Sequence, residues 1–345
     1  NETRLAIEDA SAHSGLRFIA ALNGICAGGG YELALACDEI LLVDDGNSAV
    51  SLPETPLLGV LPGTGGLTRV VDKRKVRRDL ADVFGTVAEG VKGRRAVEWR
   101  LVDAVYPTSQ FKTRVAQRAT ELAMASDRPD RGPGIRLNPL SPAVGDSGIT
   151  YSSVKVEFDR RARVATLTVS APDDSRPSTP DEMVAEGDRY WPLRAFRELD
   201  DALLRLRFNE PTIGTIIVKT SGDATQVLAV DAALIAHQDH WFVREIINFI
   251  RRTLKRMDLT SRSFFALIQP GSCFAGTLFE LALASDRSYM LDDPEQTNTI
   301  SLSAMNAGPL TMSNGLTRLQ TGFLGTPDVV AELLEENEPF DPAAA

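Results

Sequence analysis

The residues that decide the fold lie at positions 18–43, FIAALNGICAGGGYELALACDEILLV. The segment 18–22 is short and apolar, as expected of a buried strand, and the glycine run at 28–30 interrupts the apolar pattern. The segment 31–37 is rich in Ala and Leu and predicts a helix, whereas 40–43 predicts a second buried strand. A strand, a glycine turn, a helix and a strand in this order form the unit of parallel α/β layers. The sequence therefore predicts an α/β fold.

The glycine run stands directly before the start of the predicted helix. Glycine lets the backbone turn tightly and leaves N–H groups uncovered, and the start of a helix carries positive potential. Backbone donors at this point can hold an oxyanion. The alternative is a closely packed strand-to-helix turn, which composition alone favours. A nucleotide phosphate loop is not indicated, because neither GxGxxG nor GxxxxGK[ST] occurs here or at 63–66.

Two carboxylates follow the glycines. Glu32 lies in the first turn of the predicted helix, and Glu54 lies 22 residues later, in the segment SLPE at 51–54. If the strand 40–43 returns the chain to the same sheet edge, both carboxylates flank the glycine loop. Two neighbouring carboxyls in a poorly solvated pocket separate in pKa, so that one can act as acid and the other as base. Spacing alone favours the competing interpretation, in which Glu32 complements a helix N-terminus and Glu54 is solvated.

The length of 345 residues suggests two domains, and one stretch is suited to divide them. Residues 126–148 contain four prolines and four glycines, so they cannot continue a helix or a central strand. We predict a first unit at 1–125, a linker at 126–148 and a second unit at 149–345. Because the chain opens without Met and within a helical pattern at 3–8, we expect it to be an internal fragment.

The two halves contain matching segments. ELALACD at 32–38 recurs 248 residues later as ELALASD at 280–286, and GLTR at 66–69 recurs 249 residues later at 315–318. Two matches in the same order and at nearly equal offsets predict that one fold unit occurs twice.

Several motifs of the first half resemble the enoyl-CoA hydratase/isomerase (crotonase) superfamily. They are GGGYELA at 28–34, PE at 53–54, GVLPGTGGLTR at 59–69 and RRAVEWRLVD at 94–103. The resemblance covers most of 16–125. It implies the crotonase-like fold, a spiral of ββα repeats, which the internal repeat would duplicate.

The resemblance also implies a site. The amide of Gly29 would be one of two donors to the oxygen of an acyl-CoA thioester, and Glu32 and Glu54 would be the acid/base glutamates, with the division of roles between them open. The second donor and further coenzyme A contacts are expected before the first residue. Further pocket residues are expected at Gly28, Gly30 and Glu89.

A narrower resemblance is to the ring-opening branch of this superfamily. It is carried by the doubled unit and by three segments, DKRKVR at 72–77, DHWFVRE at 239–245 and GSCFAGT at 271–277. It implies hydrolytic opening of 2,3-epoxybenzoyl-CoA to 3,4-didehydroadipyl-CoA semialdehyde and formate. It also implies that the reaction uses no metal, flavin or nicotinamide. Coenzyme A enters as part of the substrate. The alternatives are an ordinary enoyl-CoA hydratase or isomerase and a non-catalytic crotonase-like scaffold.

The second half departs from the family pattern. Thr277 and Leu278 stand opposite Gly29 and Gly30, and Ala304 or a neighbour stands opposite Glu54. The segment LAVD at 228–231 resembles the family's other donor loop, with alanine where glycine is usual, and among the site residues only Glu280 persists. We expect the second unit to be a scaffold or dimerisation copy.

Composition narrows the classes of partner. The chain has 37 Lys and Arg against 47 Asp and Glu, a net charge of −10, which argues against a nucleic-acid partner. It has no apolar run of the length that spans a membrane. The three cysteines show no CxxC spacing and the three histidines no HExxH, so neither a disulfide framework nor a metal site is indicated. We expect a cytoplasmic protein that binds an aromatic acyl-CoA and forms a homo-oligomer, with a dimer favoured.

Overall fold

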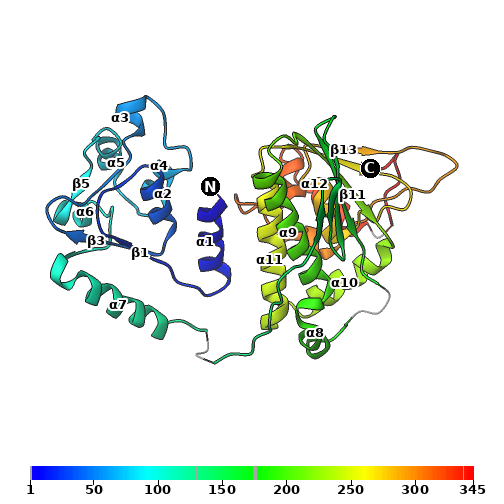
Figure 1. Ribbon diagram of the computed structural model, residues 1–345, viewed down its shortest axis with the longest axis horizontal. Coiled ribbons are helices and arrows are strands. Elements are labelled where there is room, and N and C mark those ends of the chain that lie inside the picture. Colours follow the sequence, from blue (N-terminus) through cyan, green and yellow to red (C-terminus); the bar gives the residue numbers. More distant parts are fainter. Residues whose placement is uncertain (1, 129–130, 174–176, 337) are drawn as a thin grey trace. The chain divides into compact units, whose positions relative to one another are not determined.

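The computed structural model describes residues 2–128, 131–173, 177–336 and 338–345. It separates two compact units, unit 1 at Asn1–Gly132 and unit 2 at Pro133–Ala345 (Figure 1). The boundary between the units falls inside the segment predicted as the linker.

Unit 1 alternates its strands between two small sheets. One sheet is parallel and has the order β1-β3-β6, with β1 at Ile19–Leu22, β3 at Glu39–Asp44 and β6 at Ala104–Pro107. The other has the order β2-β4-β5, with β2 at Cys26–Ala27, β4 at Ala49–Ser51 and β5 at Val91–Lys92. Because β1–β2 and β3–β4 each give one strand to each sheet before a helix follows, this is the ββα repeat predicted from the sequence.

The helices of unit 1 cover these sheets and enclose a core around α2. They are α1 (Glu2–His13), α2 (Gly29–Ala36), α3 (Glu54–Leu58), α4 (Gly66–Asp72), α5 (Arg78–Phe84), α6 (Gly93–Glu98) and α7 (Thr108–Met124). Tyr31 of α2 is fully buried, its ring meets Phe84 edge-on, and its hydroxyl donates to the Leu101 carbonyl at 2.7 Å. This bond holds Leu101 in the core. The strand β6 begins three residues later, at Ala104.

Unit 2 is built on one seven-stranded sheet, in the order β13-β12-β11-β10-β9-β8-β7. Its strands are β7 (Ala143–Gly145), β8 (Gly148–Thr150), β9 (Val154–Asp159), β10 (Val164–Ser170), β11 (Thr215–Ser221), β12 (Ser263–Ile268) and β13 (Arg287–Met290). The strands β10 to β13 are parallel, whereas β7 to β10 are antiparallel. Residues 143–148, which the sequence placed in the linker, thus form the edge strand β7 and the start of β8.

The helices of unit 2 pack around this sheet, and α9 and α11 lie side by side (Figure 1). They are α8 (Pro180–Glu186), α9 (Trp191–Asn209), α10 (Ala224–Ala236), α11 (Trp241–Asp258), α12 (Gly276–Leu283), α13 (Ala304–Ala307), α14 (Arg318–Gly322) and α15 (Asp328–Glu335), with a 3₁₀ turn at Gly187–Arg189. The helix α11 is amphipathic, and its apolar face joins the core of the unit.

The matching segments make matching contacts. In unit 1, Asp38 accepts the Phe18 amide on Oδ2 at 2.8 Å, and in unit 2 Asp286 accepts the Phe264 amide on Oδ2 at 2.7 Å. Each bond ties the end of a glycine-preceded helix to the strand before it. This shared geometry accounts for the recurring Asp, while the duplication itself stays a prediction.

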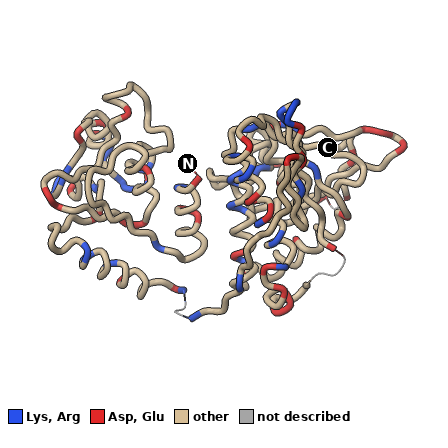
Figure 2. Tube along the Cα trace, in the orientation of Figure 1, with Lys and Arg blue, Asp and Glu red and all other residues tan. Residues whose placement is uncertain are grey.

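Charged side chains of both signs are interspersed along the chain (Figure 2). Among the described residues, no helix combines the length and the apolar character needed to cross a bilayer.

Candidate active site

The glycine run forms a sharp turn between β2 and α2. Gly28 has φ +55° and donates its amide to the Ser51 carbonyl at 3.0 Å, which joins the turn to β4. A Cβ at this position would lie 2.5 Å from Oε1 of Glu54. Position 28 therefore requires glycine both for its backbone conformation and for the approach of a carboxylate.

Gly29 is the first residue of α2, and both Gly29 and Gly30 are exposed. The first amides of a helix have no partner within the helix, so the Gly29 N–H is available to an oxygen atom from outside. A Cβ at position 29 would meet no atom within 4 Å. The surface at Gly29 is therefore open.

Glu54 is the first residue of α3, directly after Pro53. Its carboxylate lies over Gly28, and its Oε2 atom is buried with no hydrogen-bond partner among the described residues. Buried polar atoms are nearly always hydrogen-bonded, because an unpaired one loses its hydration without compensation. The position of Oε2 thus points to a proton donor supplied by a ligand or a water molecule.

Glu32 lies one helical turn beyond Gly28 and donates its backbone amide to the Gly28 carbonyl at 2.9 Å. Its side chain is only 4% exposed and turns toward the loop before α4. There Oε1 accepts the amides of Thr64 at 3.1 Å and Gly66 at 2.8 Å. Both hydrogen bonds fall on Oε1. The two glutamates thus have different surroundings: the carboxylate of Glu54 lies over Gly28, and that of Glu32 is held by the loop before α4.

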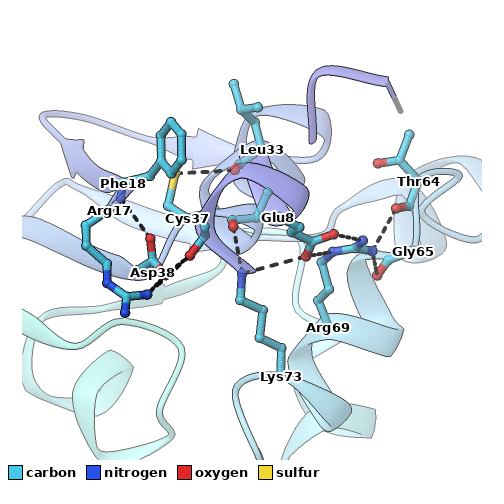
Figure 3. Close-up of polar contacts among 12 residues, drawn as sticks. Glu8, Arg17, Phe18, Leu33, Cys37, Asp38, Thr64, Gly65, Arg69 and Lys73 are labelled. Carbon is cyan, nitrogen blue, oxygen red and sulfur yellow. Dashed lines mark hydrogen bonds and ion pairs between the residues drawn. The ribbon is translucent and has the colours of Figure 1, made fainter. Parts of the chain in front are cut away.

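Arg69 holds the loop that binds Glu32 (Figure 3). Its guanidinium donates from Nε to Glu8 of α1 at 2.7 Å and from an Nη atom to the carbonyls of Thr64 and Gly65 at 3.2 and 3.3 Å. Burial opposes ionisation of Glu8, but the hydrogen bond and charge of Arg69 outweigh it and lower the pKa of Glu8. The sequence reasoning missed this role of Arg69, although its recurrence in GLTR was a signal.

The other pocket candidates are placed differently. Glu89 is exposed in a turn before β5, and no contact joins it to Glu54 among those described. Gly90 beside it has φ +77° and packs so closely that a Cβ would lie 2.4 Å from the Val50 carbonyl. The turn carrying Glu89 is therefore fixed against β4, and none of the side-chain hydrogen bonds or ion pairs given for the described residues involves Glu89. Cys26, in β2, is half-buried, and burial raises the pKa of its thiol, which disfavours a thiolate.

Exposed apolar side chains occur in the sequence both before and after the glycine turn. The sequence analysis did not identify them. They are Ile25, Leu57, Leu58, Val60 and Leu61, which are 75%, 69%, 71%, 51% and 72% exposed. A contiguous run of this kind, 57–61, directly after the carboxylate at position 54 is typical of an interaction surface. It offers contacts to an apolar group.

Unit 2 presents a different arrangement at the matching positions. The segment 228–231, predicted to resemble a donor loop, lies inside α10, where backbone amides bond within the helix. Glu280 is fully buried and accepts hydrogen bonds from Arg318 and Asn306, both at 2.8 Å. The segment 228–231 therefore offers no open backbone amide to a ligand, and Glu280 holds the packing of α12 together.

Among the residues that the structure describes, no group of three or more His, Cys, Asp or Glu side chains is placed to hold a metal ion. The polar groups around the turn are backbone amides and two carboxylates.

Comparisons with known proteins connect this geometry to a family. Residues 9–129 match the family model described as enoyl-CoA hydratase/isomerase. Over 323 residues, the chain is 57% identical to a benzoyl-CoA-dihydrodiol lyase of Aromatoleum evansii, an alignment that covers 94% of this chain and 58% of that protein. The chain thus spans little more than half the length of this relative.

Other relatives match a smaller part of the chain. A fatty acid oxidation complex subunit alpha of Shewanella loihica is 38% identical over 115 residues, 33% of this chain and 15% of that protein. Among solved structures, an enoyl-CoA hydratase of Geobacillus kaustophilus is 36% identical, with a TM-score of 0.31, over 34% of this chain and 42% of that one.

Proposed function

Because residues 9–129 carry a domain of the enoyl-CoA hydratase/isomerase family, we propose that unit 1 binds an acyl-CoA thioester at Gly29 and acts on it with Glu32 and Glu54. One observation carries the proposal. The carboxylate of Glu54 lies beside the glycine turn, and its buried Oε2 has no hydrogen-bond partner among the described residues. The amide of Gly29 in the same turn is open. An acyl thioester bound there brings the oxygen that the Gly29 amide can bind, and the water that adds to it brings the proton donor whose hydrogen bond Oε2 of Glu54 can accept.

The reaction we propose is the hydrolytic ring opening of 2,3-epoxybenzoyl-CoA to 3,4-didehydroadipyl-CoA semialdehyde and formate. The similarity to the benzoyl-CoA-dihydrodiol lyase supports it, because that alignment extends over both units. The similarity to the fatty acid oxidation subunit covers a third of the chain. The exposed apolar residues that follow Glu54 suit an aromatic acyl group better than a polar one.

The proposed ring opening depends on stabilising negative charge on the thioester oxygen. An amide at Gly29 stabilises negative charge on the thioester oxygen, which makes the attached ring an electron sink. Two water molecules are consumed for each ring opened. The first adds to the ring and opens the epoxide, and the second adds to the carbon that leaves as formate when the ring carbon–carbon bond breaks, while the thioester oxygen carries the charge. One glutamate removes a proton from water and the other gives a proton to the epoxide oxygen. The proposal leaves open which glutamate takes which role.

We propose that coenzyme A enters the reaction only as part of the substrate and that no metal, flavin or nicotinamide takes part. We further propose a cytoplasmic homodimer.

Replacing Gly29 with proline tests the amide. Proline at the first position of a helix is well tolerated, because the amide it removes has no partner in the helix. We expect kcat to fall roughly 10²–10³-fold, as for loss of one oxyanion donor. The matched control is Gly29→Ala, which keeps the amide and adds a Cβ where no atom lies within 4 Å. Equal activity of the proline and alanine variants would exclude the amide from the reaction.

The substrate class is tested by turnover of the whole protein with 2,3-epoxybenzoyl-CoA and with crotonyl-CoA. We expect formate release from the first and no hydration of the second. Hydration of crotonyl-CoA alone would identify a hydratase. A protein that neither turns over these compounds nor binds benzoyl-CoA in calorimetry would be a scaffold.

A further inference from the structure

The glycine turn of unit 1 has a close counterpart in unit 2. In unit 1, Ala27 pairs with Ser51 in parallel and Gly28 donates to the Ser51 carbonyl at 3.0 Å. In unit 2, Ala275 forms a parallel bridge with Ser301, and Gly276 donates to the Ser301 carbonyl at 2.9 Å. The two glycines are 248 residues apart and have φ of +55° and +44°.

The residues after these glycines correspond as well. Thr277 follows Gly276 as Gly29 follows Gly28, so its amide occupies the position of the proposed oxyanion donor. The helix α13 begins at Ala304, three residues after Ser301, as α3 begins at Glu54, three residues after Ser51. Unit 2 therefore repeats the donor position and replaces the glutamate with alanine.

A carboxylate from another element fills the space in unit 2. Asp231 of α10 is 1% exposed, and its Oδ2 accepts the Thr277 amide at 2.8 Å and the Ser303 hydroxyl at 2.6 Å. Its Oδ1 accepts the Thr277 hydroxyl at 2.5 Å. A Cβ on Gly276 would lie 1.9 Å from Oδ2. The carboxylate thus sits over this glycine as that of Glu54 sits over Gly28.

We propose that unit 2 contains an oxyanion-binding site made by the Thr277 amide and the hydroxyls of Thr277 and Ser303, and that Asp231 occupies it as a tethered ligand. The chemical class that fits the emptied site is a small carboxylate. One consequence rests on the proposed function: because Asp231 holds the donor that an acyl oxygen would need, the chain binds acyl-CoA only in unit 1.

The replacement Asp231→Ala, made in the whole protein, empties this site. Loss of a buried acceptor leaves three donors unpaired, and we expect the Tm of unit 2 to fall by roughly 5–10 °C. Sodium formate at about 200 mM is expected to restore roughly 3 °C or more, relative to sodium chloride at equal ionic strength, because a ligand that binds only the folded state stabilises it. The measurement is calorimetric unfolding in both salts.

Two matched proteins decide the result. The wild-type protein and Asp231→Asn both keep the site filled, so formate is expected to shift neither relative to chloride. An equal formate shift in all three proteins, or none in Asp231→Ala, would overturn the proposal. The formate-dependent unfolding of Asp231→Ala tests the site in unit 2, whereas the kcat of Gly29→Pro tests the site in unit 1. Failure of one proposal is therefore distinguishable from failure of the other.

If Asp231→Ala does not fold, hydrogen exchange of the wild-type protein provides the test. We expect the Thr277 amide, bonded to Asp231, to exchange at least roughly 100-fold more slowly than the open Gly29 amide. Equal exchange of the two amides would show that Asp231 does not occupy the site.

Discussion

Replacing Glu54 with glutamine is expected to reduce ring opening roughly 10³-fold while acyl-CoA binding changes little. Glutamine keeps the size of the side chain but cannot accept or release a proton at the position of Oε2, the buried atom for which the described residues supply no hydrogen bond. The rate is measured as formate release from 2,3-epoxybenzoyl-CoA, and binding is measured by calorimetry with benzoyl-CoA. Unchanged turnover would remove Glu54 from the proposed chemistry.

Two further variants separate chemistry from folding. Glu98→Gln changes an exposed glutamate of α6 in the same unit, whose contact is with Arg94 one turn away, and is expected to leave the rate unchanged. Glu32→Gln is expected to lower the rate and also to speed hydrogen exchange of the Thr64 and Gly66 amides, since these amides bond to its carboxylate. Glu54→Gln should not affect exchange at these two amides.

Replacing Arg318 with methionine is expected to lower the free energy of unfolding of unit 2 by about 3–5 kcal/mol. Arg318 is buried and bonds to Glu280 at 2.8 Å and to Asp258 at 2.7 Å, so its loss takes the bonded cation from the fully buried Glu280 and from the partly buried Asp258. The control is Arg256→Met, which removes a partly exposed ion pair with Asp200 and is expected to cost about 1 kcal/mol or less. Denaturation of both variants in urea measures the difference.

The effect of Arg318→Met is expected to depend on pH. Burial raises the pKa of Glu280 and of Asp258, and the charge of Arg318 opposes this rise. Without Arg318, the folded state holds protons that the unfolded chain releases above about pH 4, so the stability of the variant falls as pH rises from there. The variant and the wild-type protein should therefore differ least in acid. A difference that is constant with pH would show that the two carboxylates are not the cause.

Much of the fold can be predicted from the sequence, because the decisive signals are local. The apolar strand, the glycine run and the Ala- and Leu-rich helix in residues 18–43 each act on neighbouring residues, and the structure has β1, α2 and β3 in that order. The amphipathic period of α11 likewise comes from residues within one helix. The repeated ELALA and GLTR segments identify corresponding positions of the two units from the sequence alone.

The tertiary structure alone decided what each carboxylate touches. Glu32 meets the Gly66 amide 34 residues away, and Asp231 meets Thr277 46 residues away. No period or local preference encodes such pairs, because they form only when separate elements pack together. For the same reason the sequence of 228–231 resembles the family's other donor region, whereas in the structure this segment lies within α10. Its Asp231 accepts the Thr277 amide, which is the counterpart of the open Gly29 amide.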